Sequence, residues 1–520
     1  MSRYMSKLRL IIIVKILTAT VSIIGLAFKP FILMLLFDYD FSRGPTLVII
    51  YIVLYIVCTL ISMLFEYVSQ LHAWKLEQKF NEIVKQDLFH SITRKEYQDF
   101  SSDSIGYYVS LFNNDVKAFE QHLESLVAII QTIIQLVIYG VFLFVLDYRL
   151  AIIIILSSLL SLLIPKLTGK KLADKTSVHL EFMGKYTNII QDLLGGFKAI
   201  NIMSRVNISR YHKRNLVETE QKLYDYGKYN TFTNVISGSS MYLLEIIVLV
   251  SISVLLLLSR ITIGIAIAAL NYIQNFVYPF SYVLREINNF NATKVAKTKI
   301  LSIINQDAKE KNMVNEFIHK IELNNVSINY KDFSLENFSY VFEKGKKYAI
   351  VGHSGSGKTT LTNIILQYEK SYQGMVTIDG VDIKNIGTDL IFSNICQNEH
   401  IYDTDFFNNA SLFGSFDEDR VQKSIDFLNN EIISDISTKE DCTSLSGGEK
   451  QLLLAVRMLS KNAPILILDE AFSALDKNNR ADIEKLILSQ PEKTIIFITH
   501  DLNIKNTHLF DEIINIDSLI

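Results

Sequence analysis

The sequence has few cysteines and lacks a basic tail. Its three cysteines, Cys58, Cys396 and Cys442, lie far apart in a chain of 520 residues. This spacing fits neither a disulfide framework nor a metal site and is typical of reduced thiols on the cytoplasmic side. The net charge is −3, and the chain has no lysine- or arginine-rich tail and no patch of arginines between aromatic residues. We therefore expect no nucleic acid among its partners.

Long apolar runs dominate the first half of the chain, which contributes most of a 49% hydrophobic composition. A helix needs about 20 apolar residues to cross a bilayer. Six segments satisfy or approach this length: 10–37, 46–65, 126–146, 150–165, 241–259 and 261–280. A cleaved signal peptide is the alternative for the first segment, but its apolar run is too long and no small-residue cleavage site follows. The pattern predicts six transmembrane helices.

The connections between these segments alternate between short and long. Residues 66–125 and 166–240 are long, polar, helix-patterned and rich in lysine and arginine, whereas the other connections are tight turns with few basic residues. The positive-inside rule places both termini and both long connections in the cytoplasm. We expect the helices to continue tens of ångströms beyond the membrane before they turn back, in a multi-pass protein of the cell membrane. Frequent Ile, Asn, Lys and Tyr suggest a bacterial inner membrane.

The character of the chain changes after about residue 316. The stretches "KIELNNVSINY" and "KKYAIVG" are typical of strands, and "ILILDE" and "TIIFITH" are typical of buried parallel strands. The expected organisation is therefore an α-helical membrane domain over residues 1–315, followed by a soluble α/β domain over residues 316–520.

A glycine-rich loop follows the strand "YAIVG". Residues 352–359 fit the pattern G-x-x-x-x-G-K-[ST] of a phosphate-binding loop at the start of a helix. We expect Lys358 to reach the β- and γ-phosphates of ATP and Thr359 to bind Mg²⁺. The ATP-binding residues predicted here are Gly352, His353, Ser354, Gly355, Ser356, Gly357, Lys358, Thr359 and Thr360.

An acidic pair and a second glycine motif complete the chemistry. The apolar run "ILIL" is followed by Asp469, which we expect to hold Mg²⁺, and Glu470, which we expect to orient or deprotonate the attacking water. In "LSGGEKQ", Ser446 and two glycines open a helix and predict a second anion site. An ordinary helix cap is the simpler interpretation of Ser446 alone.

The order of these motifs, with Gln397, "SALD" and His500, resembles the ATP-binding domain of ABC transporters. With six spans and two long cytoplasmic connections, the whole chain resembles a half-transporter of the exporter type, with a P-loop ATP-binding domain that contains a helical subdomain. The resemblance implies ATP and Mg²⁺ as ligands, and a second copy of the chain as partner, because each motif occurs once. A heterodimer remains an alternative.

The resemblance also implies roles for individual residues. Tyr330 would stack on adenine, Gln397 would contact Mg²⁺, and His500 would contact Glu470 and the γ-phosphate. Asp476 would line the seam between two copies. The residues that would contact the ATP held by the other copy are Ser446, Gly447, Gly448 and Glu449. Two departures are visible: Glu449 replaces the commoner glutamine, and "STKEDCTS" before the signature lacks the usual glycine-glutamate-arginine.

The membrane half carries further expectations. Segments 99–121 and 188–203 resemble the two intracellular loops of the family. The turn near Phe112–Asp115, and a second turn near Met203–Asn207 or a few residues from it, are expected to dock in the partner's ATP domain. Ionisable residues within a span are costly and are therefore candidates for the substrate cavity. Lys29 and Glu245 are the two candidates, with Asn271 and Tyr278 weaker ones, and Lys15 is expected to reach the cytoplasmic interface.

The expected function is ATP-driven export of an amphipathic molecule, either a peptide or a drug-like compound, by a protein in contact with membrane lipid. A lipid flippase, an importer of a metal chelate on the same fold and a non-transporting membrane ATPase are the alternatives. Because only nine residues precede the first span and the chain ends soon after its last strand, we expect neither a peptidase domain nor a regulatory tail.

Overall fold

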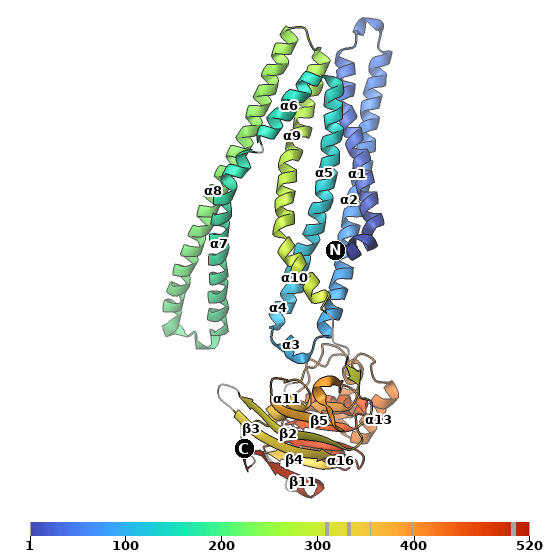
Figure 1. The fold of residues 1–520 in the computed structure, drawn as a ribbon, viewed down its shortest axis with the longest axis vertical. Helices are drawn as coiled ribbons and strands as arrows, with labels where there is room; N and C mark the ends of the chain where they lie inside the picture. Colours follow the sequence, from blue (N-terminus) through green and yellow to red (C-terminus); the bar gives the residue numbers. More distant parts are fainter. Residues whose placement is uncertain are drawn as a thin grey trace. The chain divides into compact units, whose positions relative to one another are not determined.

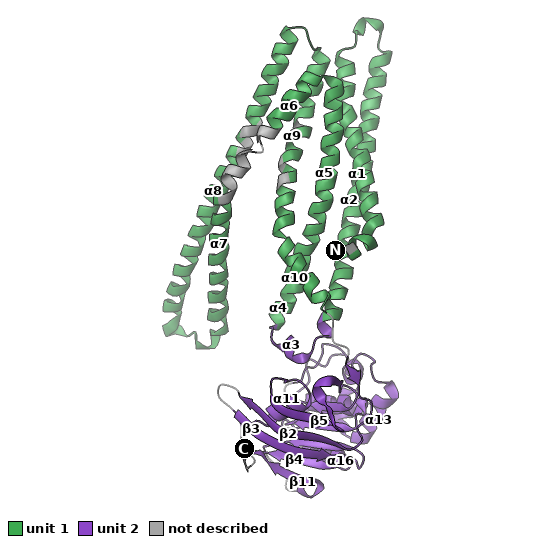
Figure 2. Cartoon of the chain, viewed as in Figure 1, with its two compact units in different colours: residues 1–91, 105–306 green, residues 92–104, 307–520 purple. Residues whose placement is uncertain are grey.

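The chain forms two compact units. A computed structural model describes residues 2–161, 163–306, 311–329, 334–353, 355–396, 399–500 and 506–518. One unit comprises residues 1–91 and 105–306, and the other comprises residues 92–104 and 307–520 (Figure 2). The boundary expected between residues 315 and 316 falls inside the second unit, which also takes in a short segment from the first half of the chain.

The first unit is built from helices alone in its described part (Figure 1). Its main helices are α1 (Ser2–Phe37), α2 (Thr46–Thr93), α4 (Ile105–Ser110), α5 (Val116–Leu146), α6 (Tyr148–Ser161), α7 (Leu163–Gly195), α8 (Ile202–Leu257), α9 (Ile263–Ala292) and α10 (Lys294–Ile304). The helix α2 has 48 residues and α8 has 56. At 1.5 Å per residue each is roughly 70–85 Å long, far more than a bilayer core of about 30 Å. The expected extensions beyond the membrane are therefore confirmed.

The apolar stretches of these helices agree with the predicted spans. Within the described residues, four helical stretches are long and apolar enough to cross a membrane: Arg3–Phe37, Thr46–Thr93, Ile105–Leu146 and Ile263–Ile304. Two shorter apolar stretches, Tyr148–Ser158 and Tyr242–Leu257, lie in α6 and α8, where the remaining two spans were expected.

Small residues bring the helices of the first unit close together. Three alanines are fully buried where the helices pack: Ala27 of α1, and Ala268 and Ala269 of α9. The hydroxyl of Tyr272 on α9 donates to the carbonyl of Ala27 at 2.6 Å. A Cβ on Gly264 would lie only 2.4 Å from the carbonyl oxygen of Met34, so this crossing requires glycine. Close backbone contact of this kind is how membrane helices gain packing energy without a hydrophobic driving force.

The second long connection is a hairpin of α7 and α8. Its tip lies at residues 196–201, with a short 3-10 helix at Phe197–Ala199 and Asn201 capping the first turn of α8. The turn predicted near Met203–Asn207, or a few residues from it, is therefore confirmed.

The first long connection turns elsewhere than expected. Leu111–Asp115 is a π-helical stretch that leads directly into α5, and the Lys299 ammonium pairs with Asp115 at 2.8 Å within the first unit. The predicted turn at Phe112–Asp115 is therefore wrong. The chain reverses between the end of α2 and the start of α4, through the short helix α3 (Tyr97–Ser101). The polar run Ser101–Ser104 ends that helix, as a cluster of serine and aspartate commonly does.

The second unit, apart from residues 92–104, is an α/β domain with two main sheets. The strands are β1 (Asn312–Met313), β2 (Lys320–Asn329), β3 (Ser334–Glu343), β4 (Lys347–Val351), β5 (Gln373–Ile378), β6 (Val381–Asp382), β7 (Ile386–Gly387), β8 (Phe392–Ile395), β9 (Ile465–Asp469), β10 (Thr494–Ile498) and β11 (Glu512–Asn515). A parallel sheet has the order β11-β4-β10-β9-β8, and an antiparallel sheet has the order β3-β2-β5-β6. The buried parallel strands predicted at "ILILDE" and "TIIFITH" are confirmed as β9 and β10.

Helices cover the parallel sheet and form a subdomain beside it. They are α11 (Lys358–Ile365), α12 (Phe406–Ser411), α13 (Glu418–Leu428), α14 (Glu431–Ile436), α15 (Gly447–Lys461) and α16 (Lys477–Leu488). One apolar cluster joins the two sheets and α11, and a second joins the helices of the subdomain to β9 and β10. The phosphate loop and the acidic pair therefore stand on a rigid, buried framework.

Candidate functional site

The phosphate loop lies between β4 and α11 with the backbone that the motif requires. Gly355 has φ 86° and Gly357 has φ 90°, a region that side-chain-bearing residues rarely adopt. The Lys358 side chain is 5% exposed, and its ammonium donates to the carbonyls of Gly352 and His353 at 2.9 and 2.8 Å. Free N–H groups at the start of α11 and this buried cation suit a bound phosphate chain.

The acidic pair lies at the same edge of the sheet as the loop. The parallel register pairs Ile498 of β10 with Asp469 of β9 and Ile350 of β4, so the carboxyl ends of all three strands meet there. Burial raises the pKa of Asp469, while a hydrogen bond from Thr359 and the Lys358 charge oppose the rise. A buried carboxylate beside a threonine hydroxyl is the oxygen set that Mg²⁺ prefers.

Glu470 adopts an unusual backbone conformation at the end of β9. Its φ is 52°, in the left-handed region, and its N–H donates to the carbonyl of Ile498 at 3.0 Å. The imidazole Nε2 of His500, directly after β10, contacts the Glu470 carboxylate. A backbone held in a sparsely populated region costs about 1–3 kcal/mol and often marks a catalytic residue. The geometry allows this carboxylate to accept a proton while the histidine orients it.

Three predicted ATP contacts, Tyr330, Ser354 and Gln397, lie outside the described residues. Their assigned roles stay predictions.

The signature motif forms the start of α15. Ser446 caps this helix: its hydroxyl accepts from the N–H of Glu449 at 3.4 Å, and its own N–H donates to the Glu449 carboxylate at 2.7 Å. The Ser446 hydrogen bonds lower the pKa of Glu449, and Lys439 pairs with the same carboxylate at 3.3 Å. Glu449 thus supports the cap within its own chain, and the expected contact with an ATP held by a second copy stays a prediction.

Both signature glycines lie in tight packing against the segment that follows β9. A Cβ on Gly447 would lie 3.3 Å from the Cβ of Ala474, and one on Gly448 would lie 3.2 Å from Leu475. The next segment begins at Asp476, which caps α16 by accepting from the N–H groups of Asn478 and Asn479 at 3.1 Å. The start of α15 and the segment 474–476 therefore form one surface, as a shared dimer seam would require.

Residues 96–98 form a contact in the second unit that the motifs did not reveal. Glu96 pairs with Lys311 at 3.0 Å and with Lys370 at 2.5 Å, and the Lys370 hydrogen bond lowers the pKa of the carboxylate. The centre of the Tyr97 ring lies 4.6 Å from that of Tyr368, just after α11, and the two rings are tilted by 40°. These contacts lie within one chain, and the expected docking of this connection in the partner's ATP domain stays a prediction.

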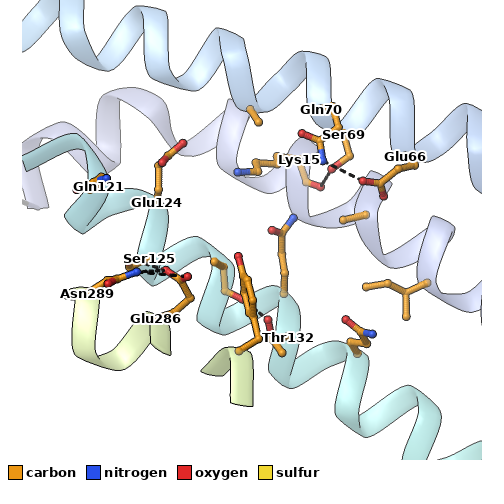
Figure 3. A pocket seen from close by; sticks show the side chains of 17 residues that line it. Lys15, Glu66, Ser69, Gln70, Gln121, Glu124, Ser125, Thr132, Glu286 and Asn289 are labelled. Atoms are coloured by element: carbon orange, nitrogen blue, oxygen red, sulfur yellow. Dashed lines mark hydrogen bonds between the residues drawn. The ribbon is translucent and has the colours of Figure 1, made fainter. Parts of the chain in front are cut away.

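The first unit contains a polar cavity of about 510 Å³ among α1, α2, α5 and α9 (Figure 3). Lys15 and three carboxylates line it, those of Glu66, Glu124 and Glu286, together with several amides and hydroxyls. Lys15 therefore lines a cavity, although the sequence suggested only an interfacial position. The glutamates were overlooked because each lies just outside an apolar run.

A second cavity of about 540 Å³ adjoins the first, because Thr132, Gln135 and Tyr282 line both. Tyr278, a weak candidate from the sequence, lines this second cavity. Neither Lys29 nor Glu245 lines either of these cavities. The Lys29 ammonium lies 4.8 Å from the Tyr55 ring centre, and Glu245 is exposed.

Comparisons with known proteins place both halves of the chain in known families. Residues 335–473 match the family model described as ABC transporter, and residues 8–280 match the model described as ABC transporter transmembrane region.

The chain is similar to bacterial proteins named ATP-dependent lipid A-core flippase. One from Pasteurella multocida is 33% identical over 38% of this chain and 36% of its own length. A relative from Legionella pneumophila (strain Paris) is 24% identical over 82% of this chain, and one from Francisella tularensis subsp. tularensis (strain FSC 198) is 25% identical over 84% of it. Each alignment spans 76% of the relative.

Proposed function

This chain belongs to the ABC transporter family, as a half-transporter of the exporter type with one transmembrane region and one ATPase domain, and from that premise we propose that it moves an amphipathic molecule out of the cytoplasmic side of a bacterial inner membrane. The cavity beside α1, α2, α5 and α9 carries the proposal. It is polar inside, yet it is built by helices with long apolar stretches. A site of this kind suits a molecule that has both a polar and an apolar part.

We further propose that ATP and Mg²⁺ bind at the sheet edge described above. Lys358 would hold the phosphates, Thr359 and Asp469 would hold the metal, and Glu470 with His500 would handle the water. The metal would neutralise charge on the phosphates, which is its usual contribution to phosphoryl transfer. Transport follows if ATP and the cargo bind inward- and outward-facing states with different affinity.

A second copy of the chain is the partner that this arrangement calls for. The signature at Ser446 starts a helix that needs an anion from outside its own phosphate loop. The tip of the α7–α8 hairpin exposes Phe197, Ile202 and Met203, the last two more than 80% exposed. Apolar side chains at the far end of a long hairpin favour an interface there.

We expect the purified chain to form a homodimer that hydrolyses ATP without another protein. One chain contains every part of the site: the phosphate loop, the signature, Glu470 and His500. Two copies would therefore provide two complete sites. Light scattering in nanodiscs measures the oligomeric state, and phosphate release measures activity. A monomer that becomes active only with a second, different protein would contradict this prediction and favour a heterodimer.

Transport itself is tested in liposomes whose ATPase domains face outward. We expect added ATP to accumulate a fluorescent amphipathic amine, dansylcadaverine, in the lumen, and we expect Lys358→Ala to abolish the accumulation. A lipid flippase is the second candidate, because the relatives carry that name. In that case ATP would instead move a fluorescent phospholipid out of the dithionite-accessible leaflet. ATP-dependent movement of neither probe would contradict the proposal.

A further inference from the structure

The polar cavity has more negative than positive groups on its walls. Glu66, Glu124 and Glu286 supply three carboxylates, and Lys15 supplies one ammonium. The formal net charge of the side chains that line this cavity is therefore −2. It is −1 when Arg285 of the adjoining cavity is included. Charges that line a concave site attract ligands of the opposite sign more strongly than charges at an open surface, because they are screened less and the walls focus their field.

Two of the carboxylates already have hydrogen-bond partners. Glu286 accepts from the Ser125 hydroxyl at 2.9 Å and lies 3.7 Å from the Arg285 guanidinium, while Glu66 accepts from the Gln70 amide at 2.9 Å. These bonds fix the orientation of both carboxylates and leave further lone pairs for a ligand.

Glu124 and Lys15 differ from these two. Among the described residues, neither side chain has a hydrogen bond or an ion pair, although both line the cavity (Figure 3). Glu124 lies beside two more carboxylates, since oxygens of Glu77, Glu120 and Glu124 are within 4.8 Å of one another. Lys15 alone cannot compensate this group. A ligand with a positive charge would relieve the repulsion among these carboxylates.

The adjoining cavity has a different character. Tyr278, Pro279 and Tyr282 line it, and the Arg285 guanidinium lies 4.8 Å from the Tyr282 ring centre. Aromatic faces accept both apolar groups and cations. The two cavities therefore form one continuous site with an acidic part and an aromatic part.

We propose that this joined site binds an amphipathic amine, with at least one ammonium group near Glu124 and Glu66 and the apolar part against Tyr278 and Pro279. The inference narrows the cargo class of the transport function proposed above and rests on it. A negatively charged lipid head would meet three carboxylates and fits poorly. The chemistry would be shared by an amine-bearing lipid and by a soluble amphipathic amine.

The test compares two fluorescent probes of opposite charge, dansylcadaverine and 6-(dansylamino)hexanoate. Each is titrated, without nucleotide, onto the full chain in phosphatidylcholine nanodiscs, and empty nanodiscs supply the background. We expect the amine to bind about tenfold more tightly than the acid, the effect of a site with net negative charge. Competition by phosphatidylethanolamine in the nanodisc and by free dodecylamine would distinguish a lipid from a soluble source of the amine.

Variants identify the responsible side chains. Glu124→Gln with Glu66→Gln should weaken amine binding by about tenfold, and Lys15→Gln should strengthen it by a few fold. Glu124→Asp, which keeps the charge, should bind nearly as the original protein does. The matched control is Glu82→Gln, because Glu82 pairs with Lys79 on α2 and lines neither cavity. Elution profile and melting temperature report folding of every variant.

Three results would overturn the inference: equal or tighter binding of the acid, a double variant that binds the amine as Glu82→Gln does, or displacement of the amine by Mn²⁺ alone. The last result would assign the glutamate group to a metal ion. If the protein bound the amine and the acid equally well but still moved cargo with ATP, only this inference would be refuted. Intact discrimination without ATP-driven movement would refute only the transport function.

Discussion

Replacing Glu470 with glutamine should lower ATP hydrolysis by about 10²- to 10³-fold while ATP binding persists, the usual effect of removing a group that acts only on the reacting water. Glutamine has the same size as glutamate and can keep the left-handed backbone at φ 52° and a hydrogen bond to His500. It cannot accept a proton. The variant should therefore accumulate as a closed dimer with ATP, measured as radiolabelled nucleotide that stays bound.

Lys358→Ala provides the contrasting result. Its ammonium is buried in the loop and would bind phosphate rather than water, so this variant should lose ATP affinity as well as hydrolysis. Glu492→Gln, a change in the turn before β10, serves as a control that should hydrolyse ATP normally. Near-normal hydrolysis by Glu470→Gln would show that another group handles the water.

The sequence predicted most of the fold and the elements of the ATP site because these depend on local patterns. A run of apolar residues predicts a span or a buried strand, and a glycine-rich loop followed by lysine predicts the turn into α11. The strands that end at Val351, Asp469 and Ile498 are short and consist mostly of buried apolar residues. Parallel pairing then brings their carboxyl ends together, so the site follows from the order of the motifs.

The cavity and the first helix reversal depend on contacts between distant residues. More than a hundred residues separate Lys15 from Glu124, and more than a hundred separate Glu124 from Glu286, so no local pattern brings them to one space. The reversal was misplaced because Leu111–Asp115 looks like a polar turn. Its leucine is fully buried and its aspartate pairs with Lys299, so that the helix continues through it.

We predict that residues 96–98 transmit changes in the ATPase domain to the rest of the chain. The side-chain amide of Gln98 makes two of their contacts. Its Nε2 donates to the Ser371 hydroxyl at 2.7 Å, and its Oε1 accepts from the backbone N–H of Lys370 at 3.2 Å. Tyr368, Lys370 and Ser371 follow the end of α11, and the phosphate loop leads into the start of the same helix. A shift of the loop on ATP binding would therefore pass along α11 to this contact and on to α2 and α4.

We expect Tyr97→Ala with Gln98→Ala to abolish transport and the stimulation of hydrolysis by cargo, while basal hydrolysis stays measurable. The double change removes the ring contact and the side-chain hydrogen bonds of Gln98, but it leaves the phosphate loop and the buried sheet untouched. Asp99→Ala is the matched control, because Asp99 is exposed in the same short helix and should transport normally. Both variants are compared in liposomes for cargo movement and phosphate release, and calorimetry reports whether the ATPase domain still unfolds at its normal temperature. Transport at the normal rate by the double variant would show that coupling passes through another surface, with the exposed tip of the α7–α8 hairpin the next to be tested.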